Sequence, residues 1–136
     1  TLIPGMAPLS AGYEIVGSIA IILAGAFPLL AVITRVFQKP LLAMGRLLGM
    51  NDVAAAGMVA TLANSIPMFG MLQDMDDRGK VLNVAFSVGA AFALGDHLGF
   101  TAGFSPQLLF PTLVAKLLSG AAAVALAMLL TKRKNA

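Results

Sequence analysis

Residues 51–72 read NDVAAAGMVATLANSIPMFGML, an apolar stretch with the roughly 20 residues that a helix needs to cross a lipid bilayer. Asn64, Ser65 and Pro67 interrupt this stretch. Proline removes a backbone donor and disfavours helical geometry in the residue before it, and Asn and Ser side chains compete for backbone hydrogen bonds. The sequence therefore predicts a helix, a break at residues 64–67, and a second helix.

The composition of the whole chain indicates that this stretch lies in a membrane. Of the 136 residues, 59% are hydrophobic and only 11% are charged, and the mean hydropathy is +0.92. An average soluble domain carries about 25% charged residues, so this chain has too few charges to cover a globule with a hydrated surface. We therefore predict an all-α, polytopic transmembrane protein with the lipid bilayer around it. Because the chain starts at Thr1 rather than Met, we expect a fragment of a longer protein.

The residue counts argue against most kinds of enzyme site. The chain has no cysteine and one histidine, which leaves no thiolate nucleophile and no multi-histidine metal site. It also has no phosphate-binding loop, dinucleotide fingerprint or hydrolase motif. We expect no catalytic residue, no cofactor and no metal. The net charge is +3, but the cations flank apolar runs, so we interpret them as topology signals rather than as a nucleic-acid surface.

Three further apolar segments, at residues 12–37, 81–104 and 107–131, are long enough to span the bilayer. Residues 38–50 are too short to span and carry two cations, which is typical of a helix at the membrane interface. Basic residues follow the first segment, precede the second and follow the third, whereas the connection at residues 101–107 has none. The chain therefore predicts a single transmembrane domain over residues 1–136.

The basic residues also predict how residues 51–72 cross the membrane. Short cytoplasmic loops carry the excess of Lys and Arg. If all three basic clusters are cytoplasmic, residues 51–72 must enter and leave on the same side, as a re-entrant hairpin with its tip at the break. The C-terminus, with its basic residues 132–134, is then cytoplasmic. The alternative is a plain kinked span with one loop misassigned. Broken helices mark substrate sites in secondary transporters.

An acidic side chain, Asp96, lies inside the second of the three further segments, with His97 beside it. A carboxylate within a membrane segment is costly and usually handles an ion or a substrate; the alternative is that Asp96 only ends a helix at the interface. His97 either titrates near neutral pH or is a structural partner of the acid. Gly95, Gly99 and Gly103 recur every four residues, which predicts close packing of another helix beside Asp96.

One lysine, Lys116, lies inside the last segment, as far after Pro106 as Asp96 is before it. We expect a structural ion pair between Lys116 and Asp96 across two antiparallel helices. The alternatives are a coupling role in transport and a side chain that extends to the interface.

The polar residues at the break are candidate contacts for a small polar ligand. Thr61, Asn64 and Ser65 offer donors and acceptors there. The alternative is that they satisfy the backbone groups that the break frees. Pro67 has a structural role in either case, because it interrupts the helix.

The stretch LANSIPMFGMLQDMDDRGKVLNVAFSVGAAFALGDHLGFTAGF, residues 62–104, closely resembles the carboxy-terminal part of the ethanolamine permease (EutH-type) family of the ethanolamine utilization operon, as does PTLVAKLLSGAAAVALAMLLTKR, residues 111–133. NSIPMFG and GDHLGFTAG are the most specific parts. The resemblance implies a multi-pass bacterial inner-membrane protein that takes up ethanolamine to feed a cobalamin-dependent lyase. Family members are longer, so the remaining helices of the full-length protein are expected partners, and no catalytic residue is carried over.

The favoured prediction is therefore a fragment of a larger secondary transporter for ethanolamine. Ethanolamine at neutral pH is mostly an ammonium ion with one hydroxyl. We hypothesise that Asp96 faces the ammonium, that Asn64 and Ser65 supply polar contacts, that exposed carbonyls at the break add to cation binding, and that His97 links uptake to pH. Two alternatives stay open: a passive facilitator for neutral ethanolamine, in which Asp96 is structural, and a non-transporting membrane scaffold. The sequence also leaves open a homo-oligomer.

Overall fold

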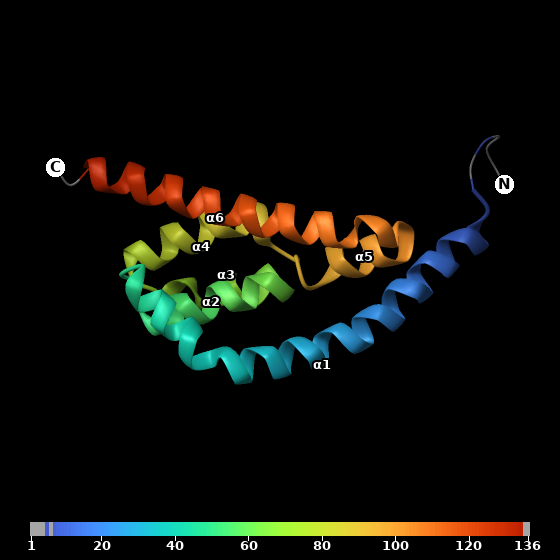
Figure 1. Ribbon diagram of the computed structural model, residues 1–136, viewed down its shortest axis with the longest axis horizontal. Helices are drawn as coiled ribbons and strands as arrows, with labels where there is room; N and C mark the ends of the chain where they lie inside the picture. The colour runs from blue at the N-terminus through green and yellow to red at the C-terminus, as the bar shows by residue number, and fades with distance from the viewer. Residues whose placement is uncertain (1–4, 6, 135–136) are drawn as a thin grey trace.

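The computed structural model describes residue 5 and residues 7–134, and this part of the chain is helical without strands. The elements are α1 (Leu9–Leu47), α2 (Asp52–Ala63), α3 (Ser65–Met71), η1 (Leu72–Asp74), α4 (Asp77–Ala90), α5 (Asp96–Phe104), η2 (Pro106–Leu108) and α6 (Leu109–Lys134). Figure 1 shows α4 and α6 side by side along one face, α1 curving along the opposite face, and α2 and α3 between them. The predicted all-α class is confirmed.

The first helix is continuous, which corrects the predicted division into a segment at residues 12–37 and a separate helix at residues 38–50. Pro28 and Pro40 both lie inside α1. A proline within a helix removes one hydrogen bond and bends the axis, and α1 is visibly curved in Figure 1. The neighbouring residues keep their helical geometry on both sides of each proline, so the helix bends rather than ends.

The predicted break in residues 51–72 is confirmed, and the chain reverses there. Asn64, between α2 and α3, has an extended backbone with φ −158° and ψ 134°. The two ends of the resulting hairpin are joined, because the Asn51 N–H donates to Asp76 Oδ1 and Asn51 Nδ2 donates to the Asp74 carbonyl oxygen, both at 2.9 Å. The segment therefore returns to the end of the molecule from which it starts.

The prediction of one helix over residues 81–104 is wrong. The chain forms two helices there, α4 and α5, separated by residues 91–95. Ala91 has an extended ψ of 137°, and Phe92 has a φ of +60°, in the left-handed region that side chains other than glycine disfavour. Residues 91–95 contain no proline from which the break could be predicted.

The predicted segment at residues 107–131 corresponds closely to η2 and α6. Among the helices of the described part, Pro106–Thr131 is the one stretch that is long and apolar enough to cross a membrane, with a mean hydropathy of 2.2. The basic side chains of residues 132–134, on which the predicted position of the C-terminus depends, lie outside the side chains that the structure describes.

Small residues bring α4 and α6 into close antiparallel contact. A Cβ added to Gly89 would lie 2.5 Å from Ser119 Oγ, and one added to Gly120 would lie 2.6 Å from Ala90 Cβ. Only glycine permits this approach of two helix backbones. The register places Lys116, one turn before Gly120, level with the break at residues 91–95.

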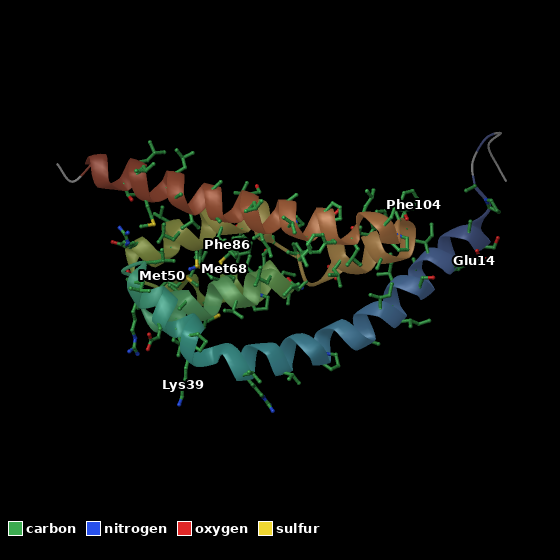
Figure 2. All side chains as sticks on the ribbon, viewed as in Figure 1. Glu14, Lys39, Met50, Met68, Phe86 and Phe104 are labelled. Carbon is green, nitrogen blue, oxygen red and sulfur yellow. The ribbon has the colours of Figure 1, made fainter. Side chains whose placement is uncertain are left out.

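The core lies where the hairpin packs against α4 and α6, and it is rich in methionine. Its buried members are Met50, Ala54, Ala55, Met58, Met68, Met75, Leu82 and Val124. Figure 2 shows Met50, Met68 and Phe86 in the interior, whereas Lys39 projects away from α1. Large apolar side chains also cover the outside, such as Val88 on α4 at 82% exposure and Leu118 on α6 at 65%. Exposed apolar surface of this extent suits contact with lipid or with further helices.

Charged side chains hold the corner between α1 and α2. Arg46 donates to both carboxylate oxygens of Asp52 at 3.2 Å, and this hydrogen bonding lowers the pKa of Asp52. Arg78 Nε, from the start of α4, donates to the Leu48 carbonyl oxygen at 2.5 Å. Gly49 has a φ of +71°, which allows the tight turn.

Candidate substrate site at the crossing of two broken helices

The two interruptions of the helical chain lie against each other. The Phe92 N–H donates to the Thr61 carbonyl oxygen at 3.0 Å, and the Leu94 N–H donates to the Leu62 carbonyl oxygen at 2.8 Å. Residues 91–95 therefore run alongside the last turn of α2 and supply donors to carbonyls that a helix end leaves free. We call residues 61–65 and 91–97 together the crossing.

Glycine is required where the two interruptions come closest. A Cβ on Gly95 would overlap the Ala63 carbonyl oxygen. The expectation that exposed carbonyls at the break add to cation binding is therefore wrong for this turn. The Thr61 and Leu62 carbonyls accept hydrogen bonds from the second interruption, and the Ala63 carbonyl is covered by Gly95.

Asp96 is the first residue of α5 and follows Gly95 directly, so it lies at the edge of the crossing. Its side chain is exposed in the described chain. A carboxylate in the first turn of a helix is favoured by the helix dipole. The structure thus brings the acidic residue and the broken helix together, which the sequence predicted, but it places Asp96 beside a second break that the sequence did not predict.

His97 follows Asp96 and packs against Phe92, with the two ring centroids 5.5 Å apart and the ring planes inclined by 51°. Both Asp96 and Lys116 lie within electrostatic reach of His97. His97 is exposed and Lys116 is half-buried on α6. His97 therefore follows a carboxylate in the sequence and interacts electrostatically with an ammonium on α6.

The predicted ion pair between Asp96 and Lys116 is not formed. Across the described ranges, the ion pairs are Arg46–Asp52 and Lys80–Asp77. The Asp96 carboxylate therefore has no cationic partner within the part of the chain that the structure describes, and it is free to bind one.

The polar residues at the α2–α3 break divide into two groups. Asn64 Oδ1 accepts a hydrogen bond from the Ile66 N–H at 2.8 Å, so this oxygen satisfies the backbone, as the alternative interpretation held. Pro67 lies in the first turn of α3, where helix N–H groups have no intrahelical partner and a missing one costs little. The hydroxyls of Thr61 and Ser65 are buried and have no hydrogen-bond partner in the described part.

Gly95, which precedes α5, and Gly99 and Gly103 within α5 lie at packing positions. Gly95 touches Ala63 of α2, and Gly99 is buried. Gly103 faces α1, where a Cβ would lie an ordinary 3.6 Å from Ile19 Cγ1. The stripe therefore contacts two different neighbours, and the contact at Gly95 is too close for any side chain, whereas that at Gly103 is not.

An apolar groove of about 360 Å³ lies away from the crossing, between α2, α4 and α6. Its walls include Met58, Phe86 and Val124. These side chains offer no hydrogen bond or charge to an amino alcohol, so the groove is not a candidate site for one.

The comparisons with known proteins give the family. A family model described as "Ethanolamine utilisation protein, EutH" matches residues 1–130. This chain belongs to the EutH family. A relative from Listeria monocytogenes, named "Probable ethanolamine permease EutH", is 65% identical over 98% of the chain. The relative of the same name from Escherichia coli is 50% identical over 99% of the chain, and the protein YxeR of Bacillus subtilis, named as uncharacterized, is 48% identical.

The chain spans 36% of the length of each of these EutH relatives. No solved structure matches it. The names of the Listeria and Escherichia relatives describe a permease, which is a transport protein rather than an enzyme.

Proposed function

We propose that this chain forms part of the pathway by which a EutH permease carries ethanolamine across the bacterial inner membrane. The observation that carries the proposal is the crossing, where two broken helices join by backbone hydrogen bonds next to an unpaired carboxylate. Irregular backbone at membrane depth is tolerated where it is buried in protein or lines a watery cavity. In secondary transporters such interruptions build the substrate site.

The chemistry of the crossing suits a small ammonium ion with a hydroxyl group. The Asp96 carboxylate supplies the negative partner of the ammonium. Asn64 is partly exposed at the opposite break and supplies an amide for the hydroxyl. His97, next to Asp96 in the sequence, changes the charge of the site when it titrates, and so links uptake to pH. The Ser65 hydroxyl, at the same break, is buried.

The proposed orientation follows from the fold. The open ends of the hairpin, the start of α4 and the end of α6 lie at the same end of the molecule in Figure 1. Arg46, Arg78 and Lys80 lie at that end as well, so we assign it to the cytoplasm. The hairpin is then re-entrant, α1, α4–α5 and α6 cross the membrane, and the C-terminus is cytoplasmic.

The test of the substrate site is uptake of labelled ethanolamine by a full-length family member that carries this sequence, reconstituted in proteoliposomes. Hydrogen bonds to a charged group contribute about 1.5–3 kcal/mol, so Asp96→Asn should lower the affinity for ethanolamine about tenfold or more. Asp74→Asn, which changes an exposed carboxylate outside the crossing, is the matched control and should transport normally. Unchanged affinity and rate for Asp96→Asn, with normal insertion, would remove Asp96 from the site.

The charge of Lys116 near the crossing supports a second candidate, passive passage of neutral ethanolamine, because a fixed cation repels an ammonium. Accumulation in the same proteoliposomes distinguishes the two. A secondary transporter concentrates ethanolamine beyond the level that ion trapping gives, whereas a facilitator stops at that level.

A further inference from the structure

Three buried side-chain oxygens in the described part of the chain have no hydrogen-bond partner: Thr61 Oγ1, Ser65 Oγ and Asn83 Oδ1. Thr61 and Asn83 have no exposed surface, and Ser65 is 6% exposed. Buried polar groups in proteins are almost always paired, and a bound water or ion is one explanation for those that have no protein partner. We call these three atoms the inner oxygens.

The lack of a partner at Thr61 is unusual even within this molecule. A helical Ser or Thr can donate to a carbonyl three or four residues earlier. Among the side chains that the structure describes, the hydroxyls of Ser18, Ser87, Thr101 and Thr131 do so. The Thr61 hydroxyl lies in the last turns of α2 and leaves that bond unmade, so it is free to bind something else.

Asn83 is held in place with its oxygen toward the hairpin. Its Nδ2 donates to the Ala54 and Gly79 carbonyl oxygens, both at 2.9 Å. A Cβ on Gly57 would lie 2.8 Å from Asn83 Oδ1, and Gly57 is one helical turn before Thr61. Side chains one turn apart share a helix face, so the Asn83 oxygen and the Thr61 hydroxyl are on the same inner face of the hairpin.

The surroundings of the inner oxygens are apolar and tightly packed. Met68 and Leu82 are fully buried beside them, and Met75 reaches Gly57. Figure 2 shows Met68, which belongs to α3 of the hairpin, within the interior. Bulk water does not reach such a place, so the protein oxygens must replace most of the hydration shell of an ion.

Hydroxyl and amide oxygens of this kind suit a dehydrated alkali cation. Neutral oxygens replace the hydration shell of such ions in channels, whereas calcium is bound mainly by carboxylates. The close packing around Gly57 favours the smaller sodium ion over potassium. We propose that the inner oxygens, with water completing the shell, bind one sodium ion.

The sodium site would act on the substrate site through the crossing. Thr61 precedes Asn64 by three residues and Ser65 follows it directly. The Thr61 carbonyl oxygen accepts a hydrogen bond from the Phe92 N–H, in the break that precedes Asp96. An ion that ties the hairpin to α4 stabilises this arrangement, so sodium and ethanolamine should each raise the affinity for the other. This coupling rests on the proposed function, whereas the ion site itself does not.

The site is tested by equilibrium binding of radioactive sodium to a purified full-length family member that carries this sequence, without ethanolamine. Thr61→Val removes the hydroxyl at nearly constant shape and should weaken sodium binding at least about tenfold, as expected when a ligand worth about 1.4 kcal/mol is lost. Ser65→Ala should weaken it in the same direction. Thr131→Val, whose hydroxyl donates to its own helix, is the matched control and should bind sodium normally.

Several results would overturn the sodium site. No saturable sodium binding by the unmodified protein, or normal binding by both Thr61→Val and Ser65→Ala, overturns the site and leaves the inner oxygens to water. Thr61→Ser keeps a hydroxyl and should bind sodium, so a folded Ser variant that fails as Thr61→Val does also overturns it. Sodium binding without any uptake of ethanolamine in proteoliposomes supports the ion site and contradicts the proposed function instead.

Discussion

The breaks at Asn64 and at residues 91–95 have the same role in the fold but different origins. At the first, Asn64 Oδ1 caps the following helix, and Pro67 fits its first turn. At the second, Gly95 precedes α5 without a side-chain cap, and Phe92 adopts a left-handed φ of +60°. The first break is encoded by the residues that form it, whereas the second depends on carbonyls that the first one provides.

The difference shows how one interruption can stabilise another. A helix that ends inside a protein leaves carbonyls without partners. Here the end of α2 offers the Thr61 and Leu62 carbonyls, and the N–H groups of Phe92 and Leu94 satisfy them. The first break therefore supplies hydrogen-bond acceptors and the second supplies donors. The position of Asp96, directly after the second break, depends on both.

The largest expected effect comes from Gly95→Ala, which tests whether the two breaks touch. The new methyl would overlap the Ala63 carbonyl oxygen, and backbone cannot move as a flexible side chain does. We expect a loss of about 3 kcal/mol or more in stability, seen as a lower unfolding temperature of the full-length protein. Gly103→Ala, whose methyl would make an ordinary contact, should change little. Equal stability of the two variants would contradict contact at Gly95.

Phe92 tests the conformation of the second break. The left-handed conformation costs a residue other than glycine about 1–2 kcal/mol. Both Phe92→Gly and Phe92→Ala lose the ring contact with His97. Only the glycine variant avoids the free-energy cost of the left-handed conformation, because glycine has no Cβ. Phe92→Gly should therefore be the more stable of the two by about 1.5 kcal/mol in denaturant unfolding. The reverse order, which a helical Phe92 would give, would contradict the break.

Asn64→Ala tests whether the first break is local in origin. It removes the acceptor of the Ile66 N–H, and loss of such a cap costs about 1 kcal/mol. Asn64→Asp keeps an acceptor and should retain most of the stability in the same unfolding measurement. Similar losses in both variants would show that the cap does not hold this break.

The smallest effect is expected at the corner between α1 and α2, far from both breaks. The pKa of Asp52 is lowered by its hydrogen bonds to Arg46. Because the folded pKa lies below the ordinary value of 3.8, the stabilisation is present above that value and is lost as the pH falls through the folded pKa. Asp52→Asn should thus be slightly less stable than the unmodified protein at neutral pH and equal to it in strong acid. A difference that persists in acid would exclude the ion pair as its cause.

The sequence predicted what depends on local chemistry. Asn64 and Pro67 predicted the first break, and the apolar run at residues 107–131 predicted α6. The sequence did not predict the features that depend on contacts between residues far apart in the chain. Nothing local marks residues 91–95 as a break, because their hydrogen bonds go to α2, and nothing local shows that α1 continues through Pro40.

The candidate site was predicted in part for the same reason. Asp96, as a carboxylate in an apolar segment, was recognisable, and its proximity to the broken helix is observed. The ion pair with Lys116 was wrong, since equal distance from Pro106 did not bring the two side chains into contact. Phe92 and Asn83 were missed, although a buried asparagine within an apolar helix is itself a signal of an internal polar contact.

The central claim is that the two breaks meet at the place where ethanolamine binds. The chain has no cysteine, so a single introduced thiol reports on its own surroundings. The decisive measurement is the rate at which a membrane-impermeant thiol reagent modifies Leu94→Cys in the full-length protein, with Gln73→Cys in the exposed η1 turn as control. Saturating ethanolamine should slow modification at position 94 and leave position 73 unchanged. Equal rates at position 94 with and without ethanolamine would contradict binding at the crossing.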